Sequence, residues 1–334
     1  KDSKYFNEFS LKPDFQHSKQ PLAGQVGLKY LDPSRTLLYS SLYWKCIIQS
    51  KVIPATKKRD VRMSKWVCLL DYISNFSNTV VLLSGGTDSS FLTYACTKAK
   101  TNVIAVTFSS MLVSKEEVDA ASKVARAFGV PHHIIDSDDL NVTEIRQNHP
   151  RRCYFCRKHR DELVKSWLKN LAPEKFVVMD GVTASDVGEY RPGLEAAEED
   201  GVLHPLKEVG LEKWEIRRLA QEFGLPFWDK PSSPCLATRF PYLTTLDEDE
   251  IARIAEAESC LMSMGLSNVR VRSYHSGVAV VEVAPDDMEK AWALKDNIKN
   301  ALFSVGFSVV ALDLDGHKSG KMDLLMGGVR HDSV

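Results

Sequence analysis

Short apolar runs alternate with helical stretches along the chain from about residue 75 onward. Four runs predict β-strands, at residues 79–83, 103–108, 132–136 and 176–180. Apolar residues at three- and four-residue spacing predict helices between them, most clearly at 116–128 and 157–171. Short apolar strands that alternate with helices form parallel sheets covered on both faces. We therefore expect an α/β domain with a Rossmann-like parallel sheet.

The order of the elements changes in the last third of the chain. A helix at 213–223 ends at Gly224, and the next stretch, 228–241, is too rich in proline for the interior of an element. Beyond this loop or linker the pattern predicts helix, strand, strand, helix and strand, at 247–264, 269–275, 278–284, 286–304 and 308–314. Ser276-Gly277 lies between the two adjacent strands and predicts a hairpin. The sequence thus predicts a second, smaller α+β domain.

These patterns divide the chain into three parts. The expected boundaries are an N-terminal extension at 1–70, the α/β domain at 71–240 and the α+β domain at 241–325. A length of 334 residues fits about two domains, and 44% hydrophobic with 26% charged residues is ordinary for a globular protein. No run approaches the roughly 18 apolar residues of a membrane span, so we expect a soluble protein.

The net charge of −1 conceals an asymmetry between the two ends of the chain. Residues 1–65 carry 13 Lys and Arg against 5 Asp and Glu, and the remainder is acidic. An acidic body argues against broad, salt-driven binding to nucleic acid. The basic segment fits a targeting presequence, a nucleic-acid-binding arm or a solvated extension. Seven unevenly placed cysteines favour a reducing compartment, so we expect the cytoplasm, with organellar import through residues 1–65 as an alternative.

A glycine turn joins the first predicted strand to a predicted helix at 90–98. Its sequence, Ser84-Gly85-Gly86-Thr87-Asp88-Ser89, has neither the lysine of a Walker loop nor the third glycine of a dinucleotide fingerprint. Glycines let a backbone approach an anion closely, and the N-terminus of a helix attracts it. The hexapeptide resembles the PP-loop of the ATP pyrophosphatase superfamily. A plain tight turn is the structural alternative.

Three cysteines form a second group of interest. Cys153 and Cys156 make a Cys-x-x-Cys motif among arginines, and Cys235 stands alone much later in the chain. Because positive charge lowers the pKa of a thiol, we expect thiolates here, which are nucleophiles and soft-metal ligands. No second Cys-x-x-Cys supplies a four-cysteine zinc site, and three thiolates suit a [4Fe-4S] cluster with one open iron. Redox, zinc with histidine and purely structural roles stay open on the spacing alone.

Seven motifs in order resemble the LarE family, ATP-dependent sulfur transferases of the PP-loop superfamily that make the nickel-pincer cofactor of lactate racemase. They are the loop 84–90, Pro150-Arg-Arg-Cys-Tyr-Phe-Cys156, Asp180-Gly-Val-Thr-Ala-Ser-Asp186, Tyr190-Arg-Pro-Gly193, Trp228-Asp-Lys-Pro231, Cys235-Leu-Ala-Thr-Arg239 and Val269-Arg-Val-Arg272. The resemblance runs from about residue 75 to 325. It implies adenylylation of a carboxylate on a pyridinium mononucleotide, attack by sulfur, and release of pyrophosphate and AMP to leave a thiocarboxylate.

The family has two branches, which differ in the source of sulfur. One sacrifices the cysteine that matches Cys235, leaving dehydroalanine, and the other holds an iron-sulfur cluster on three cysteines. Cys153 and Cys156 make this chain similar to the cluster branch, so the resemblance implies a [4Fe-4S] cluster on these two residues and Cys235. It leaves open which sulfur is transferred. Family members are often hexameric, which implies a homo-oligomer.

The resemblance also implies roles for residues outside the cysteines. Cys235 and Asp88 are the implied catalytic residues, with Asp88 acting through Mg²⁺. ATP is expected at Ser84, Gly85, Gly86, Asp88, Ser89, Ser90, Thr107 and Gly181. The last two follow strands, at the edge of the sheet where adenine and ribose contacts fall. The phosphate of the substrate is expected at Arg270, Arg272, Arg239 and Glu258.

Two of those arginines also stand out by their pattern. Arg270 and Arg272 alternate with Val269 and Val271, so both arginines project from one face of the predicted strand. Two adjacent guanidinium groups form a fork that suits a phosphate. A solvated strand face is the structural alternative.

Other functions stay possible for a PP-loop protein. A tRNA thiolase or an amide-forming synthetase uses the same adenylating loop, although a thiolase needs an RNA-binding module, for which the acidic body offers no candidate outside residues 1–65. A non-enzymatic carrier of sulfide or of an iron-sulfur cluster is a third hypothesis. The intact acidic residue Asp88 argues against the carrier. The partner we expect is a small molecule, and the sulfide source stays unknown.

Overall fold

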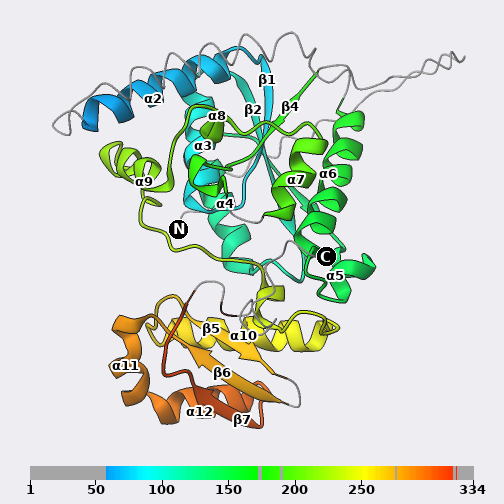
Figure 1. Ribbon diagram of the computed structural model, residues 1–334, viewed down its shortest axis with the longest axis vertical. Helices are drawn as coiled ribbons and strands as arrows, with labels where there is room; N and C mark the ends of the chain where they lie inside the picture. Colours follow the sequence, from blue (N-terminus) through cyan, green and yellow to red (C-terminus); the bar gives the residue numbers. More distant parts are fainter. Residues whose placement is uncertain (1–57, 172–174, 189–190, 275–276, 319–320, 322–334) are drawn as a thin grey trace, which may run out of the picture.

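The computed structural model describes residues 58–171, 175–188, 191–274, 277–318 and 321. A four-stranded sheet forms the centre of the first domain (Figure 1). Its strands are β1 (Asn78–Leu82), β2 (Asn102–Ser109), β3 (His132–Asp136) and β4 (Val177–Met179). All pairs are parallel and the order is β3-β2-β1-β4, which confirms the expected Rossmann-like α/β fold.

Helices cover both faces of this sheet, because successive strand residues point to opposite sides. Val81 packs in a cluster with residues of α2, α3, α4 and α9, whereas Val80 packs on the other face against Val164 of α6. The helices of this domain are α2 (Lys58–Ser74), α3 (Thr87–Lys98), α4 (Lys115–Ala127), α5 (Thr143–Arg146), α6 (Arg152–Asn170), α7 (Pro192–Glu199), α8 (Pro205–Glu208) and α9 (Lys213–Glu222). Short 3-10 turns are η2 (Asp139–Asn141), η3 (Ala184–Asp186) and η4 (Leu236–Arg239).

Helix α2 belongs to the core of the first domain. Trp66 and Ile73 are buried in the same cluster as Phe91 of α3, and the rings of Trp66 and Phe91 lie 5.5 Å apart. Arg62 pairs with Glu222 of α9 at 2.8 Å. The boundary expected at residue 70 therefore falls inside a packed helix, because the apolar face of α2 needs the rest of the domain to cover it. The remainder of the predicted extension, residues 1–57, lies outside the described residues.

The second domain combines helices with a three-stranded sheet in the order β5-β6-β7. Strands β5 and β6 are antiparallel, as the hairpin predicts, and β6 and β7 are parallel. The predicted helix at 286–304 is divided at Leu294, whose φ of −92° and ψ of 8° leave the helical region. The elements are α10 (Glu248–Ser263), β5 (Arg270–Ser273), β6 (Val278–Glu282), η5 (Pro285–Asp287), α11 (Met288–Ala293), α12 (Lys295–Ser304) and β7 (Val309–Leu312).

The two domains share one apolar cluster. Leu112 and Leu140, from the loops that follow β2 and β3, are buried together with Ile254 of α10 and Val271 of β5. The second domain therefore lies against the carboxyl edge of the parallel sheet (Figure 1). In the described ranges, no helix combines the length and the apolar character needed to cross a membrane.

Candidate active site

A cavity of about 610 Å³ lies where the two domains meet. The carboxyl ends of β1, β2 and β4 line one side of it, and α10 and β5 of the second domain line the other. Strand β1 lies between β2 and β4, so this is a point where the connections diverge to either side of one strand. Ligands of open parallel sheets bind at such points.

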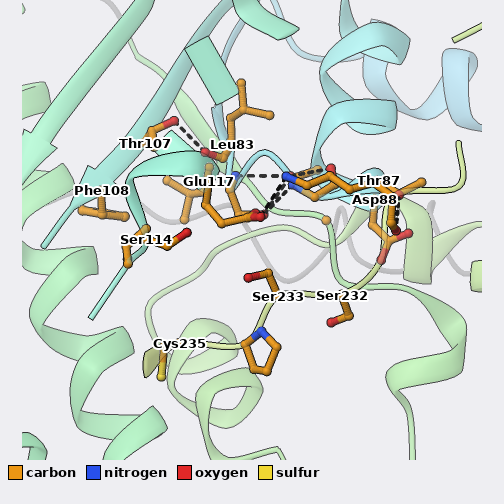
Figure 2. Close-up of a pocket in the computed structure, with 18 of the residues that line it drawn as sticks. Leu83, Thr87, Asp88, Thr107, Phe108, Ser114, Glu117, Ser232, Ser233 and Cys235 are labelled. Atoms are coloured by element: carbon orange, nitrogen blue, oxygen red, sulfur yellow. Dashed lines mark hydrogen bonds and ion pairs between the residues drawn. The ribbon is translucent and has the colours of Figure 1, made fainter. Parts of the chain in front are cut away.

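The cavity brings together most of the residues that the sequence nominates. Its walls contain Ser84, Gly86, Asp88, Ser89, Thr107, Gly181, Cys235, Arg239, Glu258 and Arg270. Five nominated residues are not part of the walls: Gly85, Ser90, Arg272, Cys153 and Cys156. Figure 2 shows Asp88, Thr107 and Cys235 around this one space.

The glycine turn has the backbone geometry of an anion site. Gly85 has a φ of +78°, and a Cβ there would lie 2.6 Å from the carbonyl oxygen of Glu117. Helix α3 begins at Thr87, and its N-cap Gly86 provides no side-chain cap. The hydroxyls of Ser84 and Ser89 lie 3.0 Å apart across the turn. The first N–H groups of α3 are thus free of a side-chain cap at the cavity wall, as binding of a phosphate requires.

Ser90 differs from the rest of the turn. Its side chain is wholly buried, and its hydroxyl has no hydrogen-bond partner among the described residues. Ser90 is not part of the cavity wall, whereas Ser89, one position earlier on the helix, is. A direct contact of the Ser90 side chain with a nucleotide is therefore not supported by this arrangement.

Asp88 lies in the first turn of α3 with its carboxyl in the cavity. Burial raises the pKa of Asp88 to about 6, and the neighbouring Asp186 contributes in the same direction. Lys213, Arg217 and Arg191 oppose the shift. A divalent cation beside this carboxyl would offset the cost of burying its charge. The cation would thereby favour the ionised form, which is the form that binds a metal.

Gly181 follows β4 and lies directly against the start of α3. A Cβ on Gly181 would lie 2.6 Å from the backbone nitrogen of Ser89 and 2.9 Å from its Cα. The absence of a side chain is therefore required by the close approach of β4 to the nucleotide turn. The residue lines the cavity as expected, but the helix is its immediate neighbour.

Thr107 lies at the carboxyl end of β2 and is buried. Its hydroxyl donates to the carbonyl oxygen of Leu83 at 2.6 Å (Figure 2). It also lies 2.8 Å from Nε2 of His132. The hydroxyl thus joins β1 to β3 across β2. Since its donor is engaged within the sheet, Thr107 shapes the cavity wall and offers a ligand its methyl and backbone surface.

The stretch from Phe227 to Leu236, which we name the Cys235 segment, is tied to the nucleotide turn at its start. Thr87 Oγ1 donates to the carbonyl oxygen of Phe227 at 2.9 Å. The Lys230 ammonium donates to the carbonyl oxygen of Gly85 at 2.9 Å and contacts Glu117 at 2.9 Å. The nucleotide turn and the segment that carries Cys235 are therefore one connected structure.

The same segment is tied to the second domain at its end. Arg270 Nη2 donates to the carbonyl oxygen of Ser232 at 2.8 Å, and Nη1 donates to that of Val269 at 2.7 Å. Burial lowers the pKa of Arg270 to about 10, and the charge of Arg239 contributes to the shift. Its Nε is buried without a partner among the described residues. An anion in the cavity would stabilise the charge of this guanidinium.

Arg239 and Glu258 are paired with each other, and their first role is structural. Arg239 is 1% exposed, and its Nε and Nη2 donate to the two carboxylate oxygens of Glu258 at 2.8 Å each. Its Nη1 donates to the carbonyl oxygens of Pro234 and Cys235 at 2.9 and 3.3 Å. Glu258 also accepts from the backbone N–H of Val271 at 2.8 Å. The pair positions the backbone around Cys235.

Arg272 does not form the expected fork with Arg270 in the cavity. Its Nη2 pairs with Glu282 at 2.8 Å, and its Nη1 donates to the carbonyl oxygen of Thr238 at 2.5 Å. Glu282, on the neighbouring strand β6, is wholly buried and requires a counter-charge. The alternation along β5 was therefore insufficient to show that one arginine faces the cavity and the other a buried carboxylate.

The cysteine pair lies on α6, which begins at Arg152 and is longer than the predicted helix. The expectation of a lowered thiol pKa is wrong for Cys153 and Cys156. Burial raises the pKa of Cys156 to about 12, although Arg160 opposes the shift. Burial also raises the pKa of Cys153, against the effect of Arg152, even though part of the residue surface remains exposed. Loss of hydration outweighs the nearby positive charge.

The three cysteines nevertheless form one electrostatic group. Cys235 is half-buried, and its charge acts on the pKa of both Cys153 and Cys156. Arg160 lies beside Cys156 and Cys235 and is held by Asp139 at 2.6 Å. Among the described residues, no three His, Cys, Asp or Glu side chains converge on the position of a single metal ion.

Several charged residues of the cavity wall were missed by sequence reasoning. They are Glu116, Glu117, Arg157, Arg160, Asp180, Asp186, Arg191, Lys213, Arg217 and Lys230. Four of them, Asp180, Asp186, Arg191 and Lys230, occur inside motifs singled out above, and those motifs were the available signal. The two residues on α9, Lys213 and Arg217, follow no motif, and only the packing of that helix brings them to the nucleotide turn.

Comparisons with known proteins agree with this architecture. A family model described as queuosine biosynthesis protein QueC matches residues 78–148, which contain the nucleotide turn. A pyridinium-3,5-bisthiocarboxylic acid mononucleotide synthase of Lactiplantibacillus plantarum is 34% identical over 264 residues, or 78% of this chain and 94% of its own. An uncharacterised protein of Synechocystis sp. is 32% identical over 268 residues, or 79% of this chain and 98% of its own.

A more distant similarity covers a smaller part of the chain. A tRNA-specific 2-thiouridylase MnmA of Xanthobacter autotrophicus is 28% identical over 193 residues, or 47% of this chain and 50% of its own. The synthase and the thiouridylase are thus both named for products that contain sulfur.

Proposed function

The chain belongs to the LarE family of ATP-dependent sulfur transferases, the family of pyridinium-3,5-bisthiocarboxylic acid mononucleotide synthase, and from this we propose that it adenylylates a carboxylate of a pyridinium mononucleotide and replaces an oxygen of that carboxylate with sulfur. The observation that carries this proposal is the shared cavity. The nucleotide turn, Cys235 and Arg270 all line it. A carboxylate activated at the turn is therefore within the same space as the sulfur-bearing side chain.

Activation of the carboxylate is assigned to the nucleotide turn. The N–H groups at the start of α3 and the hydroxyls of Ser84 and Ser89 would bind the phosphates of ATP. Asp88 would hold a Mg²⁺ ion, since a bare carboxylate beside phosphates would repel them. The carboxylate oxygen attacks the α-phosphorus, the bond to the β-phosphate breaks, and pyrophosphate leaves with the electron pair.

Sulfur transfer completes the reaction at the same carbon. A sulfur nucleophile adds to the carbonyl carbon of the acyl adenylate, and AMP leaves with the electron pair of the broken C–O bond. Arg270, whose Nε is buried without a partner in the described structure, is the group assigned to the substrate phosphate. Arg239 and Glu258 position the backbone of Cys235, and Arg272 supports the strand that presents Arg270.

The three cysteines fit a group that binds several thiolates. The charge of Cys235 raises the pKa of both other thiols because the side chains lie near one another, and the cysteines of a cluster bind different irons, so they do not have to converge as ligands of one ion do. A [4Fe-4S] cluster on Cys153, Cys156 and Cys235 would supply an open iron that carries sulfide. Arg152 and Arg160 supply positive charge that offsets the negative charge of three thiolates. A sacrificial Cys235 is the alternative source of sulfur.

The second candidate, thiolation of tRNA, rests on the thiouridylase similarity. That similarity covers 47% of this chain at 28% identity, whereas the synthase similarity covers 78% of it at 34% identity. The acidic charge of the chain beyond residue 65 also opposes broad contact with RNA. We therefore place the pyridinium substrate first. The cytoplasm stays our predicted location, and a homo-oligomer our predicted assembly.

The products of the reaction test this proposal. We expect the purified chain, with ATP, Mg²⁺, a carboxylated pyridinium mononucleotide and a sulfide source, to form AMP and pyrophosphate in equal amounts together with a thiocarboxylate. Cys235→Ala is expected to keep exchange of pyrophosphate into ATP and to lose the thiocarboxylate. Formation of ADP, or thiolation of tRNA without turnover of the pyridinium compound, would overturn the proposal.

A further inference from the structure

Lys230 occupies a position that its sequence motif alone does not explain. Its ammonium lies 2.9 Å from the carbonyl oxygen of Gly85, in the nucleotide turn, and 2.9 Å from a carboxylate oxygen of Glu117. The residue belongs to the cavity wall, as Glu117 does, and its side chain is 24% exposed. A cation is therefore held directly beside the turn, with part of its surface open to the cavity.

The partners of Lys230 leave it capable of binding an anion. An ammonium has three N–H donors, and contacts to Gly85 and Glu117 use two of them. No third partner is found in the described parts of the chain. Because Gly85 precedes the first N–H groups of α3, an anion seated on those groups is also within reach of the ammonium.

Glu117 acts on the same anion in the opposite direction. It lies in the first turn of α4, and Figure 2 shows its carboxylate turned toward the nucleotide turn. Its charge repels a phosphate, and its contact with the ammonium competes with one. From these contacts we propose that Lys230 binds the pyrophosphate part of ATP, and that Glu117 holds the ammonium over the turn and competes with the phosphates for it.

This assignment rests on the proposed function and adds a residue to its first step. When the bond between the α- and β-phosphates breaks, the electron pair goes to the oxygen of the departing pyrophosphate. Lys230 offsets that charge without a proton transfer, so the step needs no further reactant. The same residue lies five positions before Cys235, and Arg217 donates to its carbonyl oxygen at 2.8 Å. The leaving group and the sulfur-bearing side chain are thus served by one anchored segment.

Binding of inorganic pyrophosphate tests this proposal without any sulfur chemistry. Titration calorimetry of the full chain with Mg²⁺ and pyrophosphate is expected to show a loss of about 10-fold or more in affinity for Lys230→Met. Lys230→Arg keeps the charge and is expected to lie between the two. Lys299→Met removes a lysine of an exposed ion pair on α12 and is the matched control, with no change expected.

Glu117→Gln gives the result that a structural role would not produce. We expect it to tighten pyrophosphate binding by about 2- to 5-fold, since repulsion and competition are both removed. In the Lys230→Met background most of this gain is expected to vanish, because the two residues then no longer compete for one ammonium. An equal loss of affinity in Glu117→Gln and Lys230→Met, or wild-type affinity in Lys230→Met, would overturn the proposal.

The proposed function and the assignment of Lys230 can each be overturned without the other. If pyrophosphate binding responds as expected but no thiocarboxylate forms, the assignment of Lys230 stands and the proposed function falls. If the thiocarboxylate forms with AMP while Lys230→Met binds pyrophosphate normally, the function stands and the assignment falls. Thermal melting of each variant identifies any that does not fold, in which case Lys230→Arg and Glu117→Gln carry the test.

Discussion

Arg239 and Glu258 form a bidentate ion pair, with both nitrogen-to-oxygen distances at 2.8 Å, in a site that is nearly closed to water. The pair joins η4 to α10 of the second domain. Through Pro234 and Cys235 it also determines where the sulfur-bearing side chain lies. A residue expected to bind substrate thus has a prior role in the fold.

The first prediction concerns the stability of this pair. Arg239→Ala leaves Glu258 buried without its counter-charge, and we expect it to lower the free energy of unfolding by about 3–5 kcal/mol. Replacement of both residues, Arg239→Met with Glu258→Leu, is expected to cost less because no charge remains buried. Urea unfolding measures both. A change below about 1 kcal/mol in Arg239→Ala would show that the arginine is free for a ligand.

The second prediction separates glycines that look alike in the sequence. Gly85→Ala and Gly181→Ala each place a Cβ 2.6 Å from a backbone atom, and Gly85 also has a positive φ. Both are expected to displace the start of α3 and to abolish ATP binding. Gly86→Ala meets only the Ser84 hydroxyl, at 3.4 Å, and is expected to keep most of the stability. Thermal melting and calorimetry with ATP report the outcome, and equal effects in all three would contradict it.

The third prediction concerns the pH dependence caused by Asp88. Its pKa of about 6 in the folded chain lies above the ordinary value of 3.8 for an aspartate, so the unfolded chain releases this proton first as the pH rises. Asp88 therefore lowers stability progressively between about pH 4 and pH 6, and the loss is complete above that range. Asp88→Asn is expected to be more stable than the unmutated chain by about 1–3 kcal/mol at pH 8, and no different near pH 3.

Unfolding in urea from pH 4 to pH 8, without nucleotide, measures this difference. Asp71→Asn, at an exposed position of α2, controls for the loss of one charge. A stability difference that does not grow between pH 4 and pH 6 would contradict the shift. Mg²⁺ with ATP is expected to reverse the order, because the unmutated chain gains stability from binding and Asp88→Asn does not.

The fourth prediction concerns the cysteine group. Anaerobic purification is expected to yield a chain with iron and acid-labile sulfide, and Cys153→Ala is expected to lose both. Cys260→Ala, on α10, is the matched control and is expected to keep them. Absence of iron from the unmutated chain would return Cys235 to the role of sacrificial donor. In that case mass spectrometry after turnover would detect loss of H₂S at Cys235.

Local patterns were sufficient for the elements and for the nucleotide turn. The predicted strands at 79–83 and 103–108 match β1 and β2, because a fully covered parallel strand must be apolar along its whole length. The turn at Gly85 was recognisable because its backbone geometry depends on the residues of the turn itself. The family resemblance, which depends on several such local motifs in order, is also confirmed.

Partners that come from distant parts of the chain could not be predicted in this way. The sequence pattern places residues 58–70 of α2 in an extension, because the buried face of this helix is visible only once α3 and α9 pack against it. The pKa values of the Cys153 and Cys156 thiols are raised, whereas the sequence predicts that they are lowered. The sequence shows the neighbouring arginines but not the loss of hydration.

The sequence by itself thus determined the strands of both sheets, several of the helices, the nucleotide turn and the motifs of the family, all of which depend on residues close together in the chain. The tertiary structure alone decided which charges are free for a ligand. Arg272 is paired with Glu282, Arg239 is paired with Glu258, and Lys230 lies beside the turn with Glu117. Burial and pairing are properties of the packed neighbourhood, and they determine whether a charged side chain stabilises the fold or remains available to bind ATP and substrate.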